Sequence, residues 1–199
     1  GFPQELFDVQ YPAPGDAALA KETKSLIQST TVELDHDWGL DHGAWTIIRH
    51  MYPEANVPVL QLSIDYSKGA QYHYNLAKEL AALRKKGVLI MGSGNMVHNL
   101  RMVHMPNRSL DDFNKEYGYD WAAEINEIFK TKIRNGDHQS LVQYEGLHTA
   151  ARLAIPTPDH YYPLLYTLGL QEKGEQASIF NDKLLAGSLS MTSVKIGAA

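Results

Sequence analysis

The 199-residue sequence contains no cysteine. This absence excludes a disulfide framework and a thiolate metal site, so any metal ion has to be bound by histidine, aspartate or glutamate. Nine histidines are present. A metal site built on imidazole groups is therefore possible, and the histidines are the first candidates for function.

Basic charge is also scarce. The chain has 18 Lys and Arg residues against 23 Asp and Glu residues, a net charge of -5, and its longest basic run is Arg84-Lys85-Lys86. A protein that binds nucleic acid through its phosphates carries a basic patch or stripe. We therefore expect no nucleic-acid partner.

Long hydrophobic runs are missing as well. No apolar stretch approaches the roughly 20 residues that a membrane-spanning helix needs, and residues 1–10 lack the regions of a signal peptide. We expect a cytoplasmic protein with no membrane partner. The chain starts at Gly1 without a methionine, in a loop-like Gly-Phe-Pro-Gln stretch, which predicts an incomplete chain.

The remaining composition, 44% hydrophobic and 21% charged residues, is typical of a globular protein with one core, and we expect a single domain over residues 1–199. Helices are expected at residues 17–30, 44–51, 69–86, 107–132 and 160–168, and strands at 31–34, 57–64, 88–91 and 188–191. The strand, helix and strand between residues 57 and 91 have the spacing of a βαβ unit. This predicts an α/β fold with a mostly parallel or mixed central sheet flanked by helices.

The most informative segment begins where a buried strand is expected to end. It reads Met91-Gly92-Ser93-Gly94-Asn95-Met96-Val97-His98-Asn99-Leu100. The carboxyl ends of strands face the ligand crevice in open α/β sheets, and glycines there let the backbone approach a ligand. This predicts that His98 points into a crevice. The alternative is a turn of small residues with a partly buried, hydrogen-bonded histidine.

A second segment, Pro156-Thr157-Pro158-Asp159-His160-Tyr161-Tyr162-Pro163, places a histidine at an expected helix start. The partial positive charge of a helix N-terminus favours the neutral imidazole that a metal ligand must be. Asp159 is positioned as a helix cap. The alternative for His160 is a solvent-exposed histidine in a capping turn.

A third segment, Trp38-Gly39-Leu40-Asp41-His42-Gly43-Ala44-Trp45, brackets His42 with tryptophans. Aromatic walls around a polar centre suit a planar phenolic substrate. A core-packing loop is the alternative. The other six histidines have no comparable setting, and we interpret them as surface or incidental residues.

Taken together, these three segments resemble the class III extradiol ring-cleavage dioxygenases of the 4,5-DOPA dioxygenase type. Further family-like stretches are Phe2-Pro3-Gln4, Tyr11-Pro12-Ala13-Pro14-Gly15, Val59-Leu60-Gln61-Leu62-Ser63-Ile64-Asp65 and Gly187-Ser188-Leu189-Ser190-Met191. Several ordered motifs are much more specific than any one of them. The resemblance runs from one end of the chain to the other.

The resemblance implies one divalent metal ion, Fe(II) for activity or Zn(II) as isolated, and a catechol substrate that reacts with O2. It implies that His160 is a metal ligand, that His98 is an acid/base residue close enough to count as a ligand, and that His42 contacts substrate. The family's first two metal ligands lie in His-Gly-Ser-Pro and Ser-Ala-His-Trp motifs, which are absent here. We therefore expect either a chain that lacks its N-terminal metal-ligand segment or a lost metal site. A non-catalytic small-molecule binding domain and a metal-dependent hydrolase are the rival functions.

Overall fold

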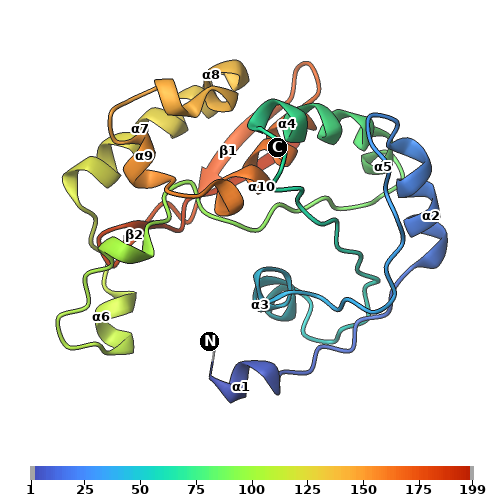
Figure 1. The fold of residues 1–199 in the computed structure, drawn as a ribbon, viewed down its shortest axis with the longest axis horizontal. Coiled ribbons are helices and arrows are strands. Elements are labelled where there is room, and N and C mark those ends of the chain that lie inside the picture. Colours follow the sequence, from blue (N-terminus) through green and yellow to red (C-terminus); the bar gives the residue numbers. More distant parts are fainter. Residues whose placement is uncertain (1–2, 198–199) are drawn as a thin grey trace. The chain divides into compact units, whose positions relative to one another are not determined.

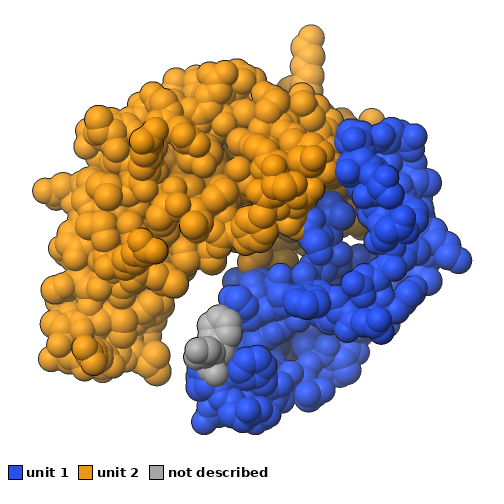
Figure 2. All heavy atoms as spheres, in the orientation of Figure 1, with its two compact units in different colours: residues 1–63 blue, residues 64–199 orange. Residues whose placement is uncertain are grey.

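The computed structural model describes residues 3–197, so Phe2, part of one family-like motif, lies outside the described residues. The chain forms two compact units, residues 1–63 and residues 64–199, which Figure 2 shows in two colours. His42 lies in the first unit, and His98 and His160 lie in the second. The expectation of one domain over residues 1–199 stays a prediction.

The described part of the first unit consists of helices joined by irregular segments (Figure 1). Helix α1 spans Gln4–Phe7, α2 spans Ala17–Leu26 and α3 spans His42–Met51. Asp16 caps α2 as predicted, and Asp41 caps α3, because each carboxylate accepts a hydrogen bond from the backbone N–H three residues later. Helix α2 ends before the expected Thr30, since Ile27 already has an extended backbone.

Three of the four expected strands are wrong. Residues 31–34, 57–64 and 88–91 pair with no strand in the part of the chain that the structure describes. The expected parallel βαβ unit is therefore also wrong for these residues. An apolar, β-branched segment becomes a strand only when a second backbone pairs with it, and the pattern of one segment does not reveal that partner. Leu89, expected to be buried, is 65% exposed.

The described helices of the second unit follow the expected ranges in part. Their bounds are α4 Ala70–Glu79, α5 Ala81–Arg84, α6 Leu110–Asn114, α7 Asp120–Arg134, α8 His138–Val142, α9 Ala151–Ala154 and α10 Tyr162–Gly169, with 3-10 turns η1 Leu100–Met102, η2 Tyr144–Gly146 and η3 Pro158–His160. The helix expected over 107–132 is interrupted at residues 115–119, and α8 and α9 were not expected. The helix expected over 69–86 is divided at Leu80. Helix α7 ends at the predicted Asn135-Gly136 stop, where Gly136 adopts a φ of 65°.

The core of the second unit is built on one face of α7. Ala122, Ile125, Phe129 and Ile133 recur every three or four residues and are fully buried. They pack with buried residues of α8, α9 and α10, and α10 also packs against α4 (Figure 1). Among residues 3–197 no helix is both long and apolar enough to cross a membrane.

Two small antiparallel sheets complete the second unit. Strand β1, Gln176–Phe180, pairs with β4, Ser193–Gly197, and β2, Leu184–Leu185, pairs with β3, Leu189–Ser190. Strand β3 confirms the strand expected near residues 188–191. Helices combined with strands confirm the α/β class. The expected mostly parallel or mixed central sheet is corrected, because the two sheets among the described residues are each two-stranded and antiparallel.

Candidate active site

The segment that carries His98 is tied to the chain leading into α10. The backbone N–H of Asn95 donates to the carbonyl oxygen of His160 at 2.8 Å, and the N–H of His98 donates to the carbonyl oxygen of Ala154 at 2.8 Å. These two bonds hold the 94–99 backbone beside η3 and α9. The position of the His98 backbone is therefore set by its neighbours rather than by a free loop.

The same segment is tied to β3 on another side. The N–H of Ser190 donates to the carbonyl oxygen of Val97 at 2.9 Å, and the Ser190 hydroxyl accepts from the Val97 N–H at 2.9 Å. The hydroxyl of Ser188 donates to the carbonyl oxygen of Asn99 at 2.8 Å. Both serines are buried, and their small side chains leave room for these close backbone contacts. The Gly-Ser-Leu-Ser-Met stretch thus supports the histidine segment.

Two glycines allow this close approach. A Cβ atom on Gly94 would fall on the carbonyl oxygen of His160, and a Cβ atom on Gly92 would fall on the carbonyl oxygen of Pro163. Any larger residue at either position would push the two chain segments apart. The glycines that we expected to bring backbone close to a ligand bring it close to the His160 segment.

The rings of His98 and His160 are stacked on each other. Their centroids lie 3.5 Å apart and their planes differ by 11°. Both side chains are partly buried. Sequence reasoning placed both histidines at one site, and the structure brings them together within the second unit. Their individual roles stay predictions.

The environment of His98 favours its neutral form. Burial, followed by the nearby His160 ring, lowers the pKa of His98 to about 4, against a smaller opposing effect from Asp159. At neutral pH the His98 ring therefore has a nitrogen lone pair. That nitrogen can accept a proton or bind a metal ion.

His160 has a different partner at each ring nitrogen. Its Nδ1 lies 3.0 Å from Oδ1 of Asn95, and its Nε2 lies 3.6 Å from Oδ2 of Asp159. Asp159 does not act as the expected cap, because the described N-termini of η3 and α10 have no side-chain cap. The Asp159 carboxylate faces the imidazole instead.

His42 is the first residue of α3, in the first unit, and its side chain is exposed. Its neighbour Asp41 caps the helix and also accepts a hydrogen bond from Gln61 at 3.1 Å. Trp38, expected to form an aromatic wall or a packed loop, is 74% exposed. The substrate-contacting role of His42 stays a prediction.

One of the histidines interpreted as incidental is part of the core. His73 of α4 is fully buried, and its Nδ1 lies 3.1 Å from the hydroxyl of Tyr166. Its ring also packs against Tyr162, with centroids 4.4 Å apart. The signal that could have found it is its spacing from the buried Leu76 and Ala77 on the same helix face.

The donor atoms fit one side of a divalent metal site. Metal-binding histidines commonly donate one ring N–H to an oxygen acceptor and bind the ion through the other nitrogen, which matches the Asn95 contact of His160. His98 supplies a second imidazole. Within residues 3–197, no group of three or more His, Cys, Asp or Glu side chains could hold a metal ion.

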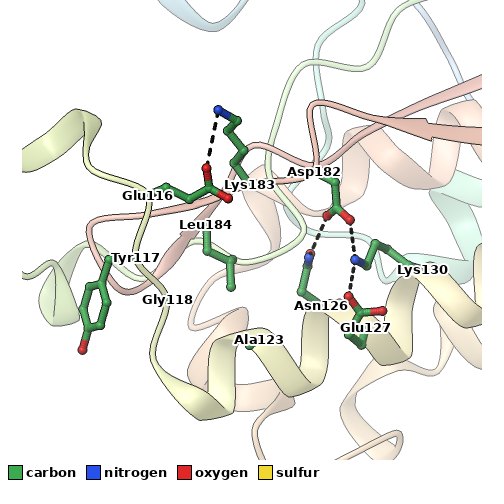
Figure 3. A pocket seen from close by; sticks show the side chains of 10 residues that line it. All are labelled: Glu116, Tyr117, Gly118, Ala123, Asn126, Glu127, Lys130, Asp182, Lys183 and Leu184. Atoms are coloured by element: carbon green, nitrogen blue, oxygen red, sulfur yellow. Dashed lines mark hydrogen bonds and ion pairs between the residues drawn. The ribbon is translucent and has the colours of Figure 1, made fainter.

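A separate cavity of about 290 Å³ lies between α7 and the segments around β2 (Figure 3). Lys130 is buried there and pairs with Asp182 and Glu127, while Asp182 also accepts a hydrogen bond from Thr192 at 3.0 Å. None of the predicted site residues lines this cavity. Its charged groups hold the β1–β2 connection against α7, which is a structural role.

Comparison with protein families gives one match over most of the chain. The family described as "Catalytic LigB subunit of aromatic ring-opening dioxygenase" matches residues 2–192. This range includes all three segments that carry the candidate histidines.

Individual relatives agree with that match. A 4,5-DOPA dioxygenase extradiol of Escherichia coli (strain K12) is 44% identical over 201 residues, covering 99% of this chain and 71% of the relative. A 4,5-DOPA dioxygenase extradiol of Beta vulgaris is 34% identical over 198 residues, covering 98% of this chain and 71% of the relative. The crystal structure of an uncharacterized protein from Escherichia coli K12 is similar with a TM-score of 0.86 at 41% identity, covering 96% of this chain and 77% of that one.

Proposed function

Because this chain belongs to the LigB family of aromatic ring-opening dioxygenases, we propose that it opens the ring of a catechol such as DOPA with O2, at one divalent metal ion. The family membership confirms the resemblance predicted from the sequence and the enzyme class, an extradiol dioxygenase. The names of the relatives support DOPA as the substrate. Fe(II) is the ion proposed for activity, and Zn(II) is the ion proposed for the protein as isolated.

The observation that carries the proposal is the stacked pair of His98 and His160. Two imidazoles at this separation, one of them with Asn95 at its second nitrogen, suit nitrogen ligation of a divalent ion. We assign His160 as a metal ligand and His98 as a residue that borders the ion closely enough to bind it. A divalent ion bound there would supply open positions for substrate oxygens and lower the pKa of the catechol hydroxyls.

The proposed role of His98 is proton transfer. Its neutral ring accepts a proton from one catechol hydroxyl and returns it later, when the ring has opened. A ring nitrogen with a pKa of about 4 is a weak base, but the negative charge of an ionised catechol beside it raises that pKa. His98 therefore gains a proton when the substrate loses one.

The proposed reaction cleaves the bond between a hydroxylated ring carbon and the neighbouring carbon outside the diol. Both atoms of O2 enter the product, a ring-opened semialdehyde, so no additional reductant is consumed. We propose that His42 donates a hydrogen bond to the substrate during this step. Its conformation at the start of α3 is set by the Asp41 cap.

Oxygen consumption tests the proposal. The protein is loaded with Fe(II) under anaerobic conditions, mixed with DOPA or caffeate, and exposed to O2 while an oxygen electrode and an absorbance spectrum are recorded. The expected result is oxygen uptake that depends on the catechol, together with a yellow ring-opened product. Binding of the catechol by the iron-loaded protein without oxygen uptake would contradict the proposal and favour the non-catalytic binding domain.

A further inference from the structure

We propose that Asn95 is a positioning residue that fixes the tautomer of His160, with the proton on Nδ1 and the lone pair on Nε2. Its importance for metal binding rests on the proposed function, in which His160 is a ligand. The tautomer itself follows from hydrogen bonds in the structure. The two parts can therefore be tested separately.

The contact with Ser190 fixes the orientation of the Asn95 amide. One end of the amide lies 2.6 Å from the carbonyl oxygen of Ser190. A carbonyl oxygen can only accept a hydrogen bond, so the amide nitrogen must point toward Ser190. The amide oxygen of Asn95 then points toward His160 without ambiguity.

The orientation of the amide decides which nitrogen of the His160 imidazole carries the proton. The Asn95 Oδ1 atom lies 3.0 Å from Nδ1 of His160. An amide oxygen can only accept, so Nδ1 must be the donor and must carry the proton. In the neutral ring the lone pair therefore lies on Nε2. The chain of contacts from Ser190 through Asn95 to His160 selects one tautomer.

Neither end of this chain of contacts can move easily. The backbone N–H of Asn95 donates to the carbonyl oxygen of His160 at 2.8 Å, so the two residues share a second contact. Ser190 is buried, and its N–H is bonded to Val97 at 2.9 Å. The absence of a side chain on Gly94 permits the close approach. Rotation of the Asn95 amide would place its oxygen opposite the carbonyl oxygen of Ser190, and two acceptors cannot form a hydrogen bond.

The Asp159 carboxylate adds negative charge near Nε2 of His160. Oδ2 of Asp159 lies 3.6 Å from Nε2 of His160, so the lone pair and a carboxylate face the same region. A cation in that region would be attracted by both groups. Asn95, being neutral, orients the ring without adding another negative charge. A carboxylate in its place would also raise the basicity of the imidazole.

The tautomer is measured by long-range ¹H–¹⁵N NMR of the histidine rings in the metal-free protein at mildly alkaline pH. The missing signals of His160→Gln assign the resonances of His160. The expected wild-type result is a proton on Nδ1. Asn95→Asp, which keeps the acceptor and loses the donor to Ser190, should retain that tautomer. Asn95→Leu should move the proton to Nε2, which faces the Asp159 carboxylate.

Metal binding gives a second readout, from Zn²⁺ competition with a chromophoric chelator. Asn95→Leu should weaken Zn²⁺ binding about 10- to 100-fold, the usual effect of removing the partner of a metal-binding histidine. Asn99→Leu is the matched control. Asn99 is buried in the same segment, donates to the carbonyl oxygen of Leu153 at 2.8 Å and accepts from the N–H of Arg101 at 3.1 Å. It should lower stability and leave the His160 tautomer unchanged.

A proton on Nε2 of His160 in the wild type would overturn the inference without any Asn95 variant. An unchanged tautomer in a folded Asn95→Leu protein would overturn it as well. If Asn95 controls the tautomer and Zn²⁺ affinity but the iron-loaded wild type consumes no oxygen with catechols, the inference stands and the proposed function fails. Loss of the tautomer in Asn99→Leu would show a general structural effect and count against Asn95.

Discussion

Arg84 and Glu175 form a two-point ion pair, with the guanidinium nitrogens 2.9 Å and 2.6 Å from the two carboxylate oxygens. The same guanidinium donates to the carbonyl oxygen of Leu170 at 2.5 Å. Both side chains are largely shielded, with exposed fractions of 23% and 20%. One side chain thus joins the end of α5 to the residue after α10 and to the residue before β1.

Arg84→Ala should destabilise the protein by about 1–3 kcal/mol, because a shielded carboxylate and a carbonyl lose their donors. Urea unfolding followed by circular dichroism measures this change. The neighbouring Lys85 is the control, since its pair with Glu172 spans 3.3 Å and is mostly exposed. Lys85→Ala should cost less than about 1 kcal/mol. Equal losses in the two variants would contradict the role of Arg84.

The burial of His73 predicts a stability loss in acid. Burial lowers the pKa of His73, because the charged ring is poorly solvated beside Tyr166. The unfolded chain then binds a proton more readily than the folded protein. The contribution of neutral His73 to the free energy of unfolding is therefore fully present above the unfolded pKa of about 6.5. It decreases as the pH drops below that value.

Unfolding of the wild type and of His73→Asn at several pH values between neutral and mildly acidic isolates this residue. The wild type should lose stability with a contribution from His73 of up to about 1.4 kcal/mol per pH unit, and the variant should lack that contribution. His138, whose pKa burial also lowers, remains in both proteins and cancels in the comparison. The exposed His50 serves as the control, and His50→Asn should follow the wild type.

Gly94→Ala should separate the two segments that carry the candidate site. The added Cβ would occupy the position of the His160 carbonyl oxygen. We expect a destabilisation of about 1–3 kcal/mol, typical of overpacking, and reduced Zn²⁺ affinity. Gly146→Ala is the control because nothing lies within 4 Å of its Cβ position. A folded Gly94→Ala protein with wild-type stability and Zn²⁺ affinity would show that this close approach is unimportant.

Features that depend on local chemistry could be predicted from the sequence. The helix cap at Asp16 and the helix stop at Gly136 depend only on neighbouring residues, and both are present. The grouping of His98 with His160 came from family-like motifs, because periodicity alone does not bring residues from distant segments together. The family was correctly recognised for the same reason.

Features that depend on a distant partner could not be predicted. Residues 57–64 and 88–91 have the composition of strands, yet pairing requires a neighbouring backbone, and the described residues provide none. The contact between Asn95 and Ser190 has no pattern of its own, because an asparagine in a loop has many possible partners. The sequence shows Asn95 within its motif, but only the structure shows its contact with the His160 ring.

His98→Ala tests proton transfer against metal binding. If His98 acts mainly as an acid/base residue, the variant should lose about 10²- to 10⁴-fold in the rate of ring opening while it still binds iron. Iron content after anaerobic loading and the rate of oxygen uptake with DOPA are measured on the same samples. His104→Ala is a suitable control, because His104 follows in the chain and its ring contacts Tyr117 instead of His160. A loss of iron as severe as the loss of rate would make His98 primarily a ligand. Retained rate in the iron-loaded variant would remove His98 from the mechanism, since its neutral ring beside His160 would then have no role in moving the catechol proton.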